Sequence, residues 1–267
     1  MNVRDLFDLS GRIAIVTGGA TGIGLQMADA LAELGASVVL CGRDGGRCER
    51  AAADLERARG IRCAGLACDV SSSDDVTRLV AETCDRFGRI DVLVNNAGTA
   101  WAGPVEDTPL RGWQKVVDVN LTGVFLCSQA VGRVMIGQGG GRIVNVASIT
   151  GLRGSPPEEL DAIAYSTTKG AVVAFTRDLA AKWARHGIAV NAIAPGWFPT
   201  DLSRPVLDRA GDRLTAAIPL RRYGGDSDLK GAIAYLASAA SAYVTGHTLV
   251  VDGGTTLLGP PRHTEAQ

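Results

Sequence analysis

Two side chains capable of acid–base chemistry stand four residues apart in the segment 161–185, which has the periodicity of a helix. They are Tyr165 and Lys169, and a spacing of four places both on one face of a helix. A tyrosine in water has a pKa of about 10 and is a poor base at neutral pH. A nearby ammonium group stabilises the phenolate and lowers that pKa, so the pair is suited to proton transfer. Taken alone, the same spacing is also typical of an ordinary surface pair.

A glycine-rich turn, TGGATGIG, follows the first apolar run of the chain and precedes a predicted helix. Glycines let a backbone approach a pyrophosphate closely, and the free N–H groups at the start of a helix can bind it. The spacing differs from the common G-x-G-x-x-G fingerprint and is weak evidence alone. Its place between a buried strand and a helix predicts a cofactor-binding turn made of Gly18, Thr21, Gly22, Ile23 and Gly24.

The choice between nicotinamide cofactors depends on the end of the second predicted strand, which reads LCGRD. An acidic residue there binds the 2′-hydroxyl of NAD, whereas an arginine accommodates the 2′-phosphate of NADP. Gly42 stands where the acid is expected, and Arg43 follows it. A guanidinium can hold a phosphate with two parallel hydrogen bonds, so NADP(H) is favoured over NAD(H). Two alternatives remain open: Arg43 as a solvated loop residue, and Asp44 in the role of the acid.

Short runs rich in valine and isoleucine alternate with longer segments of helical periodicity. Several runs are apolar almost throughout, as expected for strands buried on both faces of a sheet. This alternation predicts one doubly wound, Rossmann-type α/β domain over residues 1–267, with a parallel sheet of about seven strands and helices on both faces. The predicted strands are 12–17, 36–41, 61–68, 90–95, 142–147, 188–193 and 248–251, and the predicted helices are 22–34, 45–58, 73–87, 107–136, 161–185 and 227–238.

Composition argues against several other classes of protein. A formal net charge of -1 gives no electrostatic case for a nucleic-acid partner. No apolar stretch reaches the roughly 18 residues that span a bilayer, and the first ten residues lack a signal-peptide core, so a cytoplasmic protein without a membrane partner is expected. The six cysteines and three histidines, His263 among them, show no ligand spacing, so no metal site is predicted.

Further motifs appear in a fixed order along the chain: Asp69-Val70 after the third predicted strand, the sequence NNAG at 95–98, Asn120, Ser148, the sequence YSTTK at 165–169, and Pro195-Gly196 with Thr200. Together with the glycine turn, this set resembles the short-chain dehydrogenase/reductase family over residues 9–254, leaving 255–267 as a tail that is expected to be loosely ordered beyond Gly259. The resemblance implies an oxidoreductase that moves a hydride between a nicotinamide and a carbonyl or secondary-alcohol carbon.

The resemblance also implies roles for individual residues. Tyr165 would exchange a proton with the substrate oxygen, Ser148 would hold that oxygen, Lys169 would bind the nicotinamide ribose, and Asn120 would position a relay water. Asp69 and Val70 would contact the adenine, and Asn96, Ala97 and Gly98 would line the adenosine side. Pro195, Gly196, Phe198 and Thr200 would bracket the carboxamide and the pyrophosphate. A small-molecule substrate and a homotetramer are implied as well, and a catalytically idle cofactor-binding scaffold or sensor is the alternative.

Two irregular segments follow the carboxyl ends of predicted strands, where ligands bind in open α/β sheets. They are 151–162, whose Pro156 and Pro157 exclude a continuous helix, and 196–215, predicted as a loop with short helical pieces. Substrate choice is assigned to the residues around Trp101, to 149–162 and to Trp197 through Leu207. Ser148 and Tyr165 are 17 residues apart, more than is usual in the family, and the extra residues fall in 154–162. Glu158, Glu159 and Asp161 are interpreted as a solvated turn. The candidate substrate residues are Trp101, Thr150, Arg153 and Trp197, and the candidate substrates are a keto or hydroxy sugar acid and a 3-oxoacyl thioester.

Overall fold

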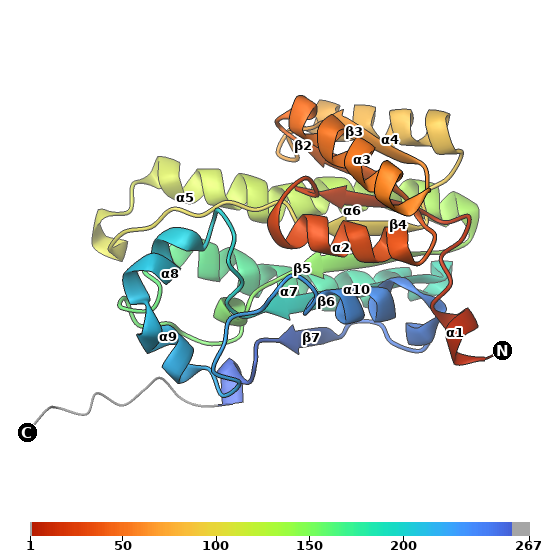
Figure 1. Cartoon of the computed structure of the whole chain (residues 1–267). Helices are drawn as coiled ribbons and strands as arrows, with labels where there is room; N and C mark the ends of the chain where they lie inside the picture. The colour runs from red at the N-terminus through yellow and green to blue at the C-terminus, as the bar shows by residue number, and fades with distance from the viewer. Residues whose placement is uncertain (1, 258–267) are drawn as a thin grey trace, which may run out of the picture.

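The computed structural model describes residues 2–257, so His263 and the tail beyond 257 lie outside it (Figure 1). Its centre is a parallel seven-stranded sheet in the order β3-β2-β1-β4-β5-β6-β7. The chain order reverses between β1 and β4, which creates the crevice where doubly wound sheets bind ligands. The predicted fold class is therefore confirmed. The strands are β1 Ile13–Thr17, β2 Ser37–Gly42, β3 Cys63–Ala67, β4 Val92–Asn95, β5 Gly141–Val146, β6 Ile188–Pro195 and β7 Thr248–Val251.

Helices cover both faces of the sheet (Figure 1). One layer consists of α2 Gly22–Glu33, α3 Gly45–Arg59 and α10 Lys230–Ala237, and the other consists of α4 Ser73–Phe87, α5 Leu110–Val117, α6 Gly123–Gln138 and α7 Ile163–Trp183. The short helix α1 Val3–Leu6 precedes the sheet, and α8 Arg204–Ala210 and α9 Asp212–Ala217 follow β6. These last two confirm the short helical pieces expected in 196–215. We call residues 196–224 the lid.

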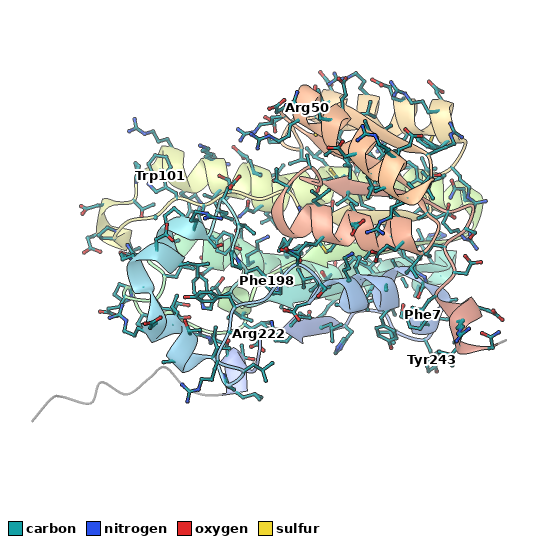
Figure 2. The ribbon with its side chains drawn as sticks, in the orientation of Figure 1. Phe7, Arg50, Trp101, Phe198, Arg222 and Tyr243 are labelled. Carbon is teal, nitrogen blue, oxygen red and sulfur yellow. The ribbon has the colours of Figure 1, made fainter. Side chains whose placement is uncertain are left out.

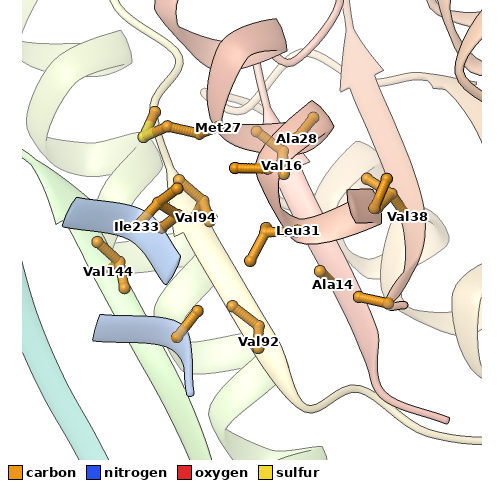
Figure 3. Packing of buried hydrophobic residues seen from close by; sticks show 14 of the residues in the cluster. Ala14, Val16, Met27, Ala28, Leu31, Val38, Val92, Val94, Val144 and Ile233 are labelled. Carbon is orange, nitrogen blue, oxygen red and sulfur yellow. The ribbon is translucent and has the colours of Figure 1, made fainter. Parts of the chain in front are cut away.

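The core lies in two layers because successive residues of a strand point to opposite faces. Ala14 and Val16 of β1 pack with Leu31 of α2 and Ile233 of α10 in one apolar cluster (Figure 3). Ile15 between them belongs to the cluster under α4 and α6. All five residues of β1 are buried, which explains why this strand shows no polar alternation in sequence.

One long helix departs from its prediction. The expected helix 107–136 is a continuous run from Leu110 to Gln138 with a π-helical turn at Asp118–Thr122. By length and composition this run is apolar enough to cross a membrane, contrary to the expectation that no segment reaches that length. Its buried residues, including Val131 and Met135, pack in the core beneath the sheet with residues of α4. The apolar composition therefore serves core packing.

All strands run in the same direction, so their carboxyl ends share one edge of the sheet. Trp101 and Phe198 lie toward that edge, whereas Phe7 and Tyr243 lie at the opposite end of the molecule (Figure 2). The glycine turn, the residues after β5 and the lid all follow carboxyl ends of strands. The sheet thus brings the motifs that are scattered through the sequence to one side of the protein.

Candidate active site

The turn between β1 and α2 requires its glycines. Gly18 and Gly22 have φ values of 61° and 53°, a region that side chains other than glycine rarely adopt. A Cβ atom on Gly24 would lie 2.4 Å from the carbonyl oxygen of Gly18. Thr21 begins α2 without a side-chain capping hydrogen bond. The N–H groups of the first turn are therefore not bonded by the Thr21 side chain, and such N–H groups at a helix start can bind an anion.

The NNAG segment after β4 supports this turn directly. Asn96 Nδ2 donates to the carbonyl oxygens of Thr17 and Gly18 at 2.9 and 3.1 Å. The backbone N–H groups of Asn96 and Ala97 donate to Thr17 Oγ1 at 2.9 and 3.0 Å. Thr17, a buried threonine that ends β1, was not among the site residues predicted from the sequence. The polar groups of this segment thus hold the glycine turn in shape.

The ends of β2 and β3 form the region assigned to the adenosine. Arg43 is exposed at the end of β2, and no ion-pair partner for it is found among residues 2–257. The carboxylate of Asp44 accepts a hydrogen bond from the Arg47 N–H at 2.9 Å and caps α3, which weakens its candidacy as the ribose acid. Asp69 accepts hydrogen bonds from Ser71, and Val70 is buried against Gly123 of α6. This arrangement suits a dinucleotide whose adenosine end would lie beside Arg43, a cation with no ion-pair partner among residues 2–257.

Ser148, Tyr165 and Lys169 converge at the end of β5. Lys169 Nζ donates to the carbonyl oxygen of Val146 at 2.7 Å and lies 5.6 Å from the centre of the Tyr165 ring. The Ser148 hydroxyl accepts hydrogen bonds from Thr150 N and Oγ1 at 3.2 and 3.0 Å and lies within hydrogen-bonding reach of the Tyr165 side chain. Residues that are far apart in sequence therefore form one polar cluster.

Burial controls the protonation of this cluster. It raises the pKa of the Tyr165 phenol, and the hydrogen bond with Ser148 offsets only part of that rise. It lowers the pKa of Lys169 from 10.5 to about 8, because the charged form loses its hydration. The expectation that the Lys169 ammonium would leave Tyr165 with a lowered pKa is therefore wrong for the free protein, since desolvation of the phenolate dominates.

Asn120 lies in the π-helical turn and is fully buried. Its side-chain oxygen accepts from Thr99 N at 2.8 Å, and its amide nitrogen donates to Thr99 O at 2.9 Å and to Thr168 Oγ1 at 3.3 Å. Thr168 Oγ1 in turn donates to the carbonyl oxygen of Tyr165 at 2.8 Å. The Asn120 amide therefore joins the segment after NNAG to the helix that carries Tyr165, and its donors are used in doing so.

Gly98 joins the NNAG segment to the polar cluster of Ser148, Tyr165 and Lys169. A Cβ atom at this position would lie 3.6 Å from Asn120 Oδ1 and 3.9 Å from Lys169 Nζ. On the other flank, Gly22 lies against Thr200 of the lid, whose Cγ2 would be 3.1 Å from a Cβ atom there. The glycine turn thus lies next to the lid, and the NNAG segment lies next to the residues of α7 that include Lys169.

Comparisons with known proteins match this arrangement. A family model described as Enoyl-(Acyl carrier protein) reductase matches residues 18–256. A 3-oxoacyl-[acyl-carrier-protein] reductase from Synechocystis sp. is 39% identical over 92% of this chain and 97% of its own length. The crystal structure of a short-chain type dehydrogenase/reductase from Mycobacterium marinum is similar with a TM-score of 0.92 at 40% identity, covering 96% of this chain and 100% of that one.

The crystal structure of a gluconate 5-dehydrogenase from Burkholderia cenocepacia J2315 in complex with NADP and tartrate has a TM-score of 0.91 at 40% identity, covering 97% of this chain and 100% of the other. The chain belongs to the short-chain dehydrogenase/reductase family. It is therefore an oxidoreductase of the class that interconverts CH–OH and C=O groups.

Within this short-chain dehydrogenase/reductase, the predicted substrate residues divide into two groups. Thr150 is buried beside Ser148, and Trp197 is buried in the lid cluster with Leu207 and Leu214. Trp101 instead packs against α5, where a Cβ atom on Gly112 would lie 2.5 Å from its ring. Trp101, predicted as a substrate residue, is thus engaged in packing against α5.

The contacts of Arg153 contradict the interpretation of Glu159 as part of a solvated turn. Its guanidinium forms a two-pronged ion pair with Glu159, with Nη1 donating to Glu159 Oε2 at 3.0 Å and Nη2 to the other oxygen. The two side chains are only 21% and 11% exposed. Glu159 is therefore not part of a solvated turn, and Arg153 already has a carboxylate partner. The sequence offered no signal for this pair because its geometry depends on the Pro156 turn between them.

Phe198 also differs from its assigned role. Its ring is buried in the core against Gly224, so any contact of this residue with a carboxamide would come from its backbone. Gly196 is held by its N–H, which donates to Val251 O at 2.9 Å. The lid is thus anchored to β7 at one end and to the core through Phe198.

Proposed function

We propose that this protein is an NADP(H)-dependent oxidoreductase that interconverts a carbonyl and a secondary alcohol, with Tyr165 as the proton donor or acceptor. The observation that carries the proposal is the convergence of Ser148, Tyr165 and Lys169 at the end of β5. The cofactor supplies or accepts the hydride when it is bound. The side chains supply the proton and hold the substrate oxygen.

In the reducing direction, the raised pKa keeps the Tyr165 phenol protonated at neutral pH, so it can donate a proton to the oxygen of the reduced carbonyl. Ser148 donates a hydrogen bond to the same oxygen and stabilises the charge that develops there. Lys169, with a pKa of about 8, exchanges protons near neutral pH and can reprotonate the phenolate. Asn120 positions this helix through Thr168.

The preference for NADP(H) rests on Arg43 and on Asp44. Arg43 is exposed at the end of β2, while Asp44 is engaged as the cap of α3. The Burkholderia cenocepacia gluconate 5-dehydrogenase, described as bound to NADP, supports the same assignment. Arg43→Ala should weaken NADPH binding about tenfold or more and leave NADH binding unchanged in a fluorescence titration, whereas Arg57→Ala at the far end of α3 should change neither. Tighter binding of NADH by the native chain would contradict this assignment.

Two substrate classes follow from the relatives, a keto or hydroxy sugar acid and a 3-oxoacyl thioester. We also propose that the enzyme is cytoplasmic and works as a homotetramer. Phe125 and Ile136 of α6 and Val250 of the edge strand β7 are apolar and partly exposed, which suits surfaces that are covered by other copies. Light scattering of the purified protein tests the oligomeric state.

The decisive test is Tyr165→Phe, which removes one hydroxyl and preserves the ring. Turnover of butane-2,3-dione with NADPH, followed by absorbance at the nicotinamide band, should fall by a factor of about 10² to 10⁴, while NADPH binding stays intact. Tyr223→Phe is a matched control, because that hydroxyl bonds to Gly211 O in the lid. Cofactor binding without turnover of any carbonyl by the native enzyme would favour the scaffold or sensor.

A further inference from the structure

A cavity of about 300 Å³ lies at the amino ends of the strands, at the end of the molecule that carries α1 (Figure 1). Arg12 stands directly before β1, Asp91 stands directly before β4, and Arg142 is the second residue of β5. All three line this cavity, together with Arg89 and the glycines that follow α6. The cofactor and substrate motifs follow carboxyl ends of strands, so this cavity is separate from the active site.

Positive side chains outnumber negative ones around this cavity. Its charged lining consists of three arginines and of two aspartates, Asp8 and Asp91. Asp8 is exposed, and its carboxylate accepts hydrogen bonds from the N–H and the hydroxyl of Ser10 at 2.9 and 2.6 Å. Asp8 therefore has partners of its own, and Asp91 is the carboxylate that contacts the arginines.

The carboxylate of Asp91 is fully engaged. Its Oδ1 accepts from Arg12 Nη1 at 2.9 Å and from Arg89 Nη2 at 2.7 Å. Its Oδ2 accepts from Arg89 Nε at 2.8 Å and from Ile13 N at 3.0 Å. Burial would raise the pKa of Asp91, but these hydrogen bonds outweigh it and leave that pKa lowered. This carboxylate thus satisfies Arg89 and part of Arg12, and none of its bonds goes to Arg142.

The guanidinium of Arg142 is left without a partner. Arg142 is half-buried, and no ion pair or side-chain hydrogen bond is found for it among residues 2–257. Burial lowers the pKa of this guanidinium, and repulsion from Arg12 lowers it further. A cation that is withdrawn from water without a partner costs stability, and so do two like charges that lie close together. An anion in the cavity would offset both costs.

The carboxyl ends of α6 and α10 also border the cavity, but their carbonyl groups have other donors. The N–H groups of Gly139 and Gly140 donate to carbonyl oxygens in the last turn of α6 at 3.2 and 2.9 Å. The Ser238 hydroxyl donates to a carbonyl oxygen in the last turn of α10 at 3.3 Å. The helix ends retain partial negative charge, yet this charge makes none of the hydrogen bonds that the Arg142 guanidinium can donate.

We propose that this cavity binds a small oxyanion, the phosphate or carboxylate group of a low-molecular-weight ligand. Arg142 and the N–H groups of Arg12 that Asp91 does not use are its donors. A guanidinium holds such a group with two parallel hydrogen bonds, and a volume of about 300 Å³ is sufficient for a small ligand. Because the anion binds the folded protein, it stabilises the fold.

The test is thermal unfolding of the protein saturated with NADPH, so that anions cannot act through the cofactor site. Inorganic phosphate and malonate are compared with chloride at equal ionic strength. At least one oxyanion should raise Tm by about 2 to 4 °C over chloride, and calorimetric titration should show one site. Arg142→Gln should weaken binding about tenfold or more and remove most of the rise in Tm, without lowering Tm in chloride.

Two further variants control for charge and for position. Arg142→Lys keeps the charge but not the planar fork, so it should retain part of the rise. Arg50→Gln removes an exposed arginine of α3 that does not line the cavity, and it should retain the whole rise. A larger rise with phosphate would identify a phosphate group, a larger rise with malonate would identify a carboxylate, and equal rises would show that the site binds both.

The proposal is overturned if neither oxyanion raises Tm more than chloride does, or if Arg142→Gln keeps the full rise. It is also overturned if Arg142→Gln lowers Tm in chloride while phosphate has no effect, because Arg142 would then serve the helix ends. Turnover of butane-2,3-dione that depends on Tyr165 tests the proposed function separately, since the cavity lies at the opposite edge of the sheet.

Discussion

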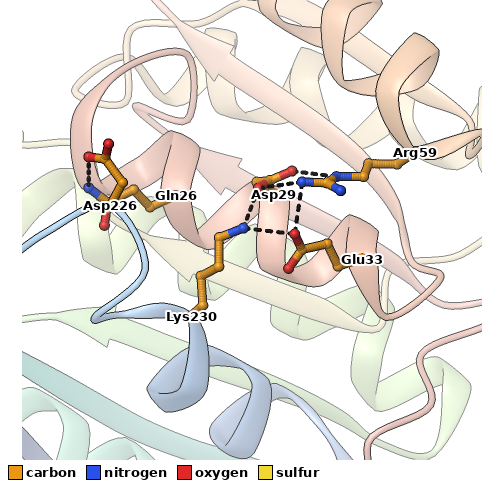
Figure 4. A network of polar contacts seen from close by, with 6 residues as sticks. All are labelled: Gln26, Asp29, Glu33, Arg59, Asp226 and Lys230. Atoms are coloured by element: carbon orange, nitrogen blue, oxygen red, sulfur yellow. Dashed lines mark hydrogen bonds and ion pairs between the residues drawn. The ribbon is translucent and has the colours of Figure 1, made fainter.

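Two polar regions of this protein differ in whether their buried polar groups have partners. On the face formed by α2, α3 and α10, Asp29 and Glu33 alternate with Arg59 and Lys230, and each charge contacts both of the opposite charges (Figure 4). In the 151–162 loop and the lid, by contrast, three buried side-chain atoms have no hydrogen-bond partner: Arg153 Nε, Ser155 Oγ and Trp197 Nε1. The face that joins the three helices therefore satisfies its own polar groups, whereas the loop and the lid leave three polar atoms without a partner among the described residues.

The cluster of Ser148, Tyr165 and Lys169 resembles the second region, because it also contains a buried polar group that lacks a full set of partners. Lys169 is 4% exposed, and its only hydrogen-bond acceptor among residues 2–257 is the Val146 carbonyl. A buried ammonium without a carboxylate costs stability. The comparison therefore separates charged residues that stabilise the fold from a buried lysine that costs stability.

Among the variants that test this comparison, Lys169→Met should show the largest effect. The native pKa of about 8 lies below the unfolded value of 10.5, so the unfolded chain binds the proton more tightly between these pH values. The burial cost, about 3 kcal/mol, is fully present below pH 8 and disappears as the pH rises to 10.5. The variant should lose turnover, yet its unfolding free energy at pH 7 should rise by about 1 to 3 kcal/mol, because the lost hydrogen bond offsets part of the gain.

Urea unfolding at pH 7 and at pH 10.5 measures this effect. The gain should be present at pH 7 and nearly absent at pH 10.5. Lys182→Met on the exposed face of the same helix is the control and should show no such pH-dependent gain. A Lys169→Met variant that is less stable than the native protein at pH 7 would place Lys169 among the stabilising residues.

A smaller effect is expected where the loop meets the lid. Leu160→Ala removes part of the apolar contact with the lid cluster, and a half-buried leucine contributes about 1 to 2 kcal/mol. The loop, which joins Ser148 to Tyr165, should then be held less firmly, so KM for butane-2,3-dione should rise severalfold. Steady-state kinetics and thermal unfolding measure both, with the exposed Leu110→Ala as the control. Unchanged KM values would mean that the loop and the lid act independently.

The smallest effect is expected in the paired region. Lys230→Met removes one cation from the network and should lower the unfolding free energy by about 0.5 to 1 kcal/mol, with no change in any kcat/KM. Desolvation raises the pKa of Asp29, but hydrogen bonds from Arg59 and Lys230 outweigh it and leave that pKa below 3.8. The stabilisation is therefore present at neutral pH and is lost as the pH falls through the folded pKa. A change in kinetics with intact stability would show that this face also serves catalysis.

Local signals were sufficient to predict most of the elements. The predicted boundaries of α3 and α4 lie within one residue of the observed ones, because Asp44 and Ser72 cap their first turns and Gly60 and Gly88 end them in the left-handed conformation. The glycine turn was predictable for the same reason, since only glycine tolerates the backbone of Gly18 and Gly22. The π-helical turn at Asn120 was not, because its extra residue is stabilised by Thr99, which lies 21 positions away.

The sequence by itself determined the parallel sheet, the order of its motifs and the identity of the side chains that gather at its carboxyl edge. These depend on apolar periodicity, caps and glycines, which act within a few residues. The tertiary structure alone decided the direction of the Tyr165 pKa shift, the pairing of Arg153 with Glu159 and the three unpaired donors of the loop and the lid. Desolvation and hydrogen-bond satisfaction depend on which surfaces meet in space, and no local pattern of residues carries that information.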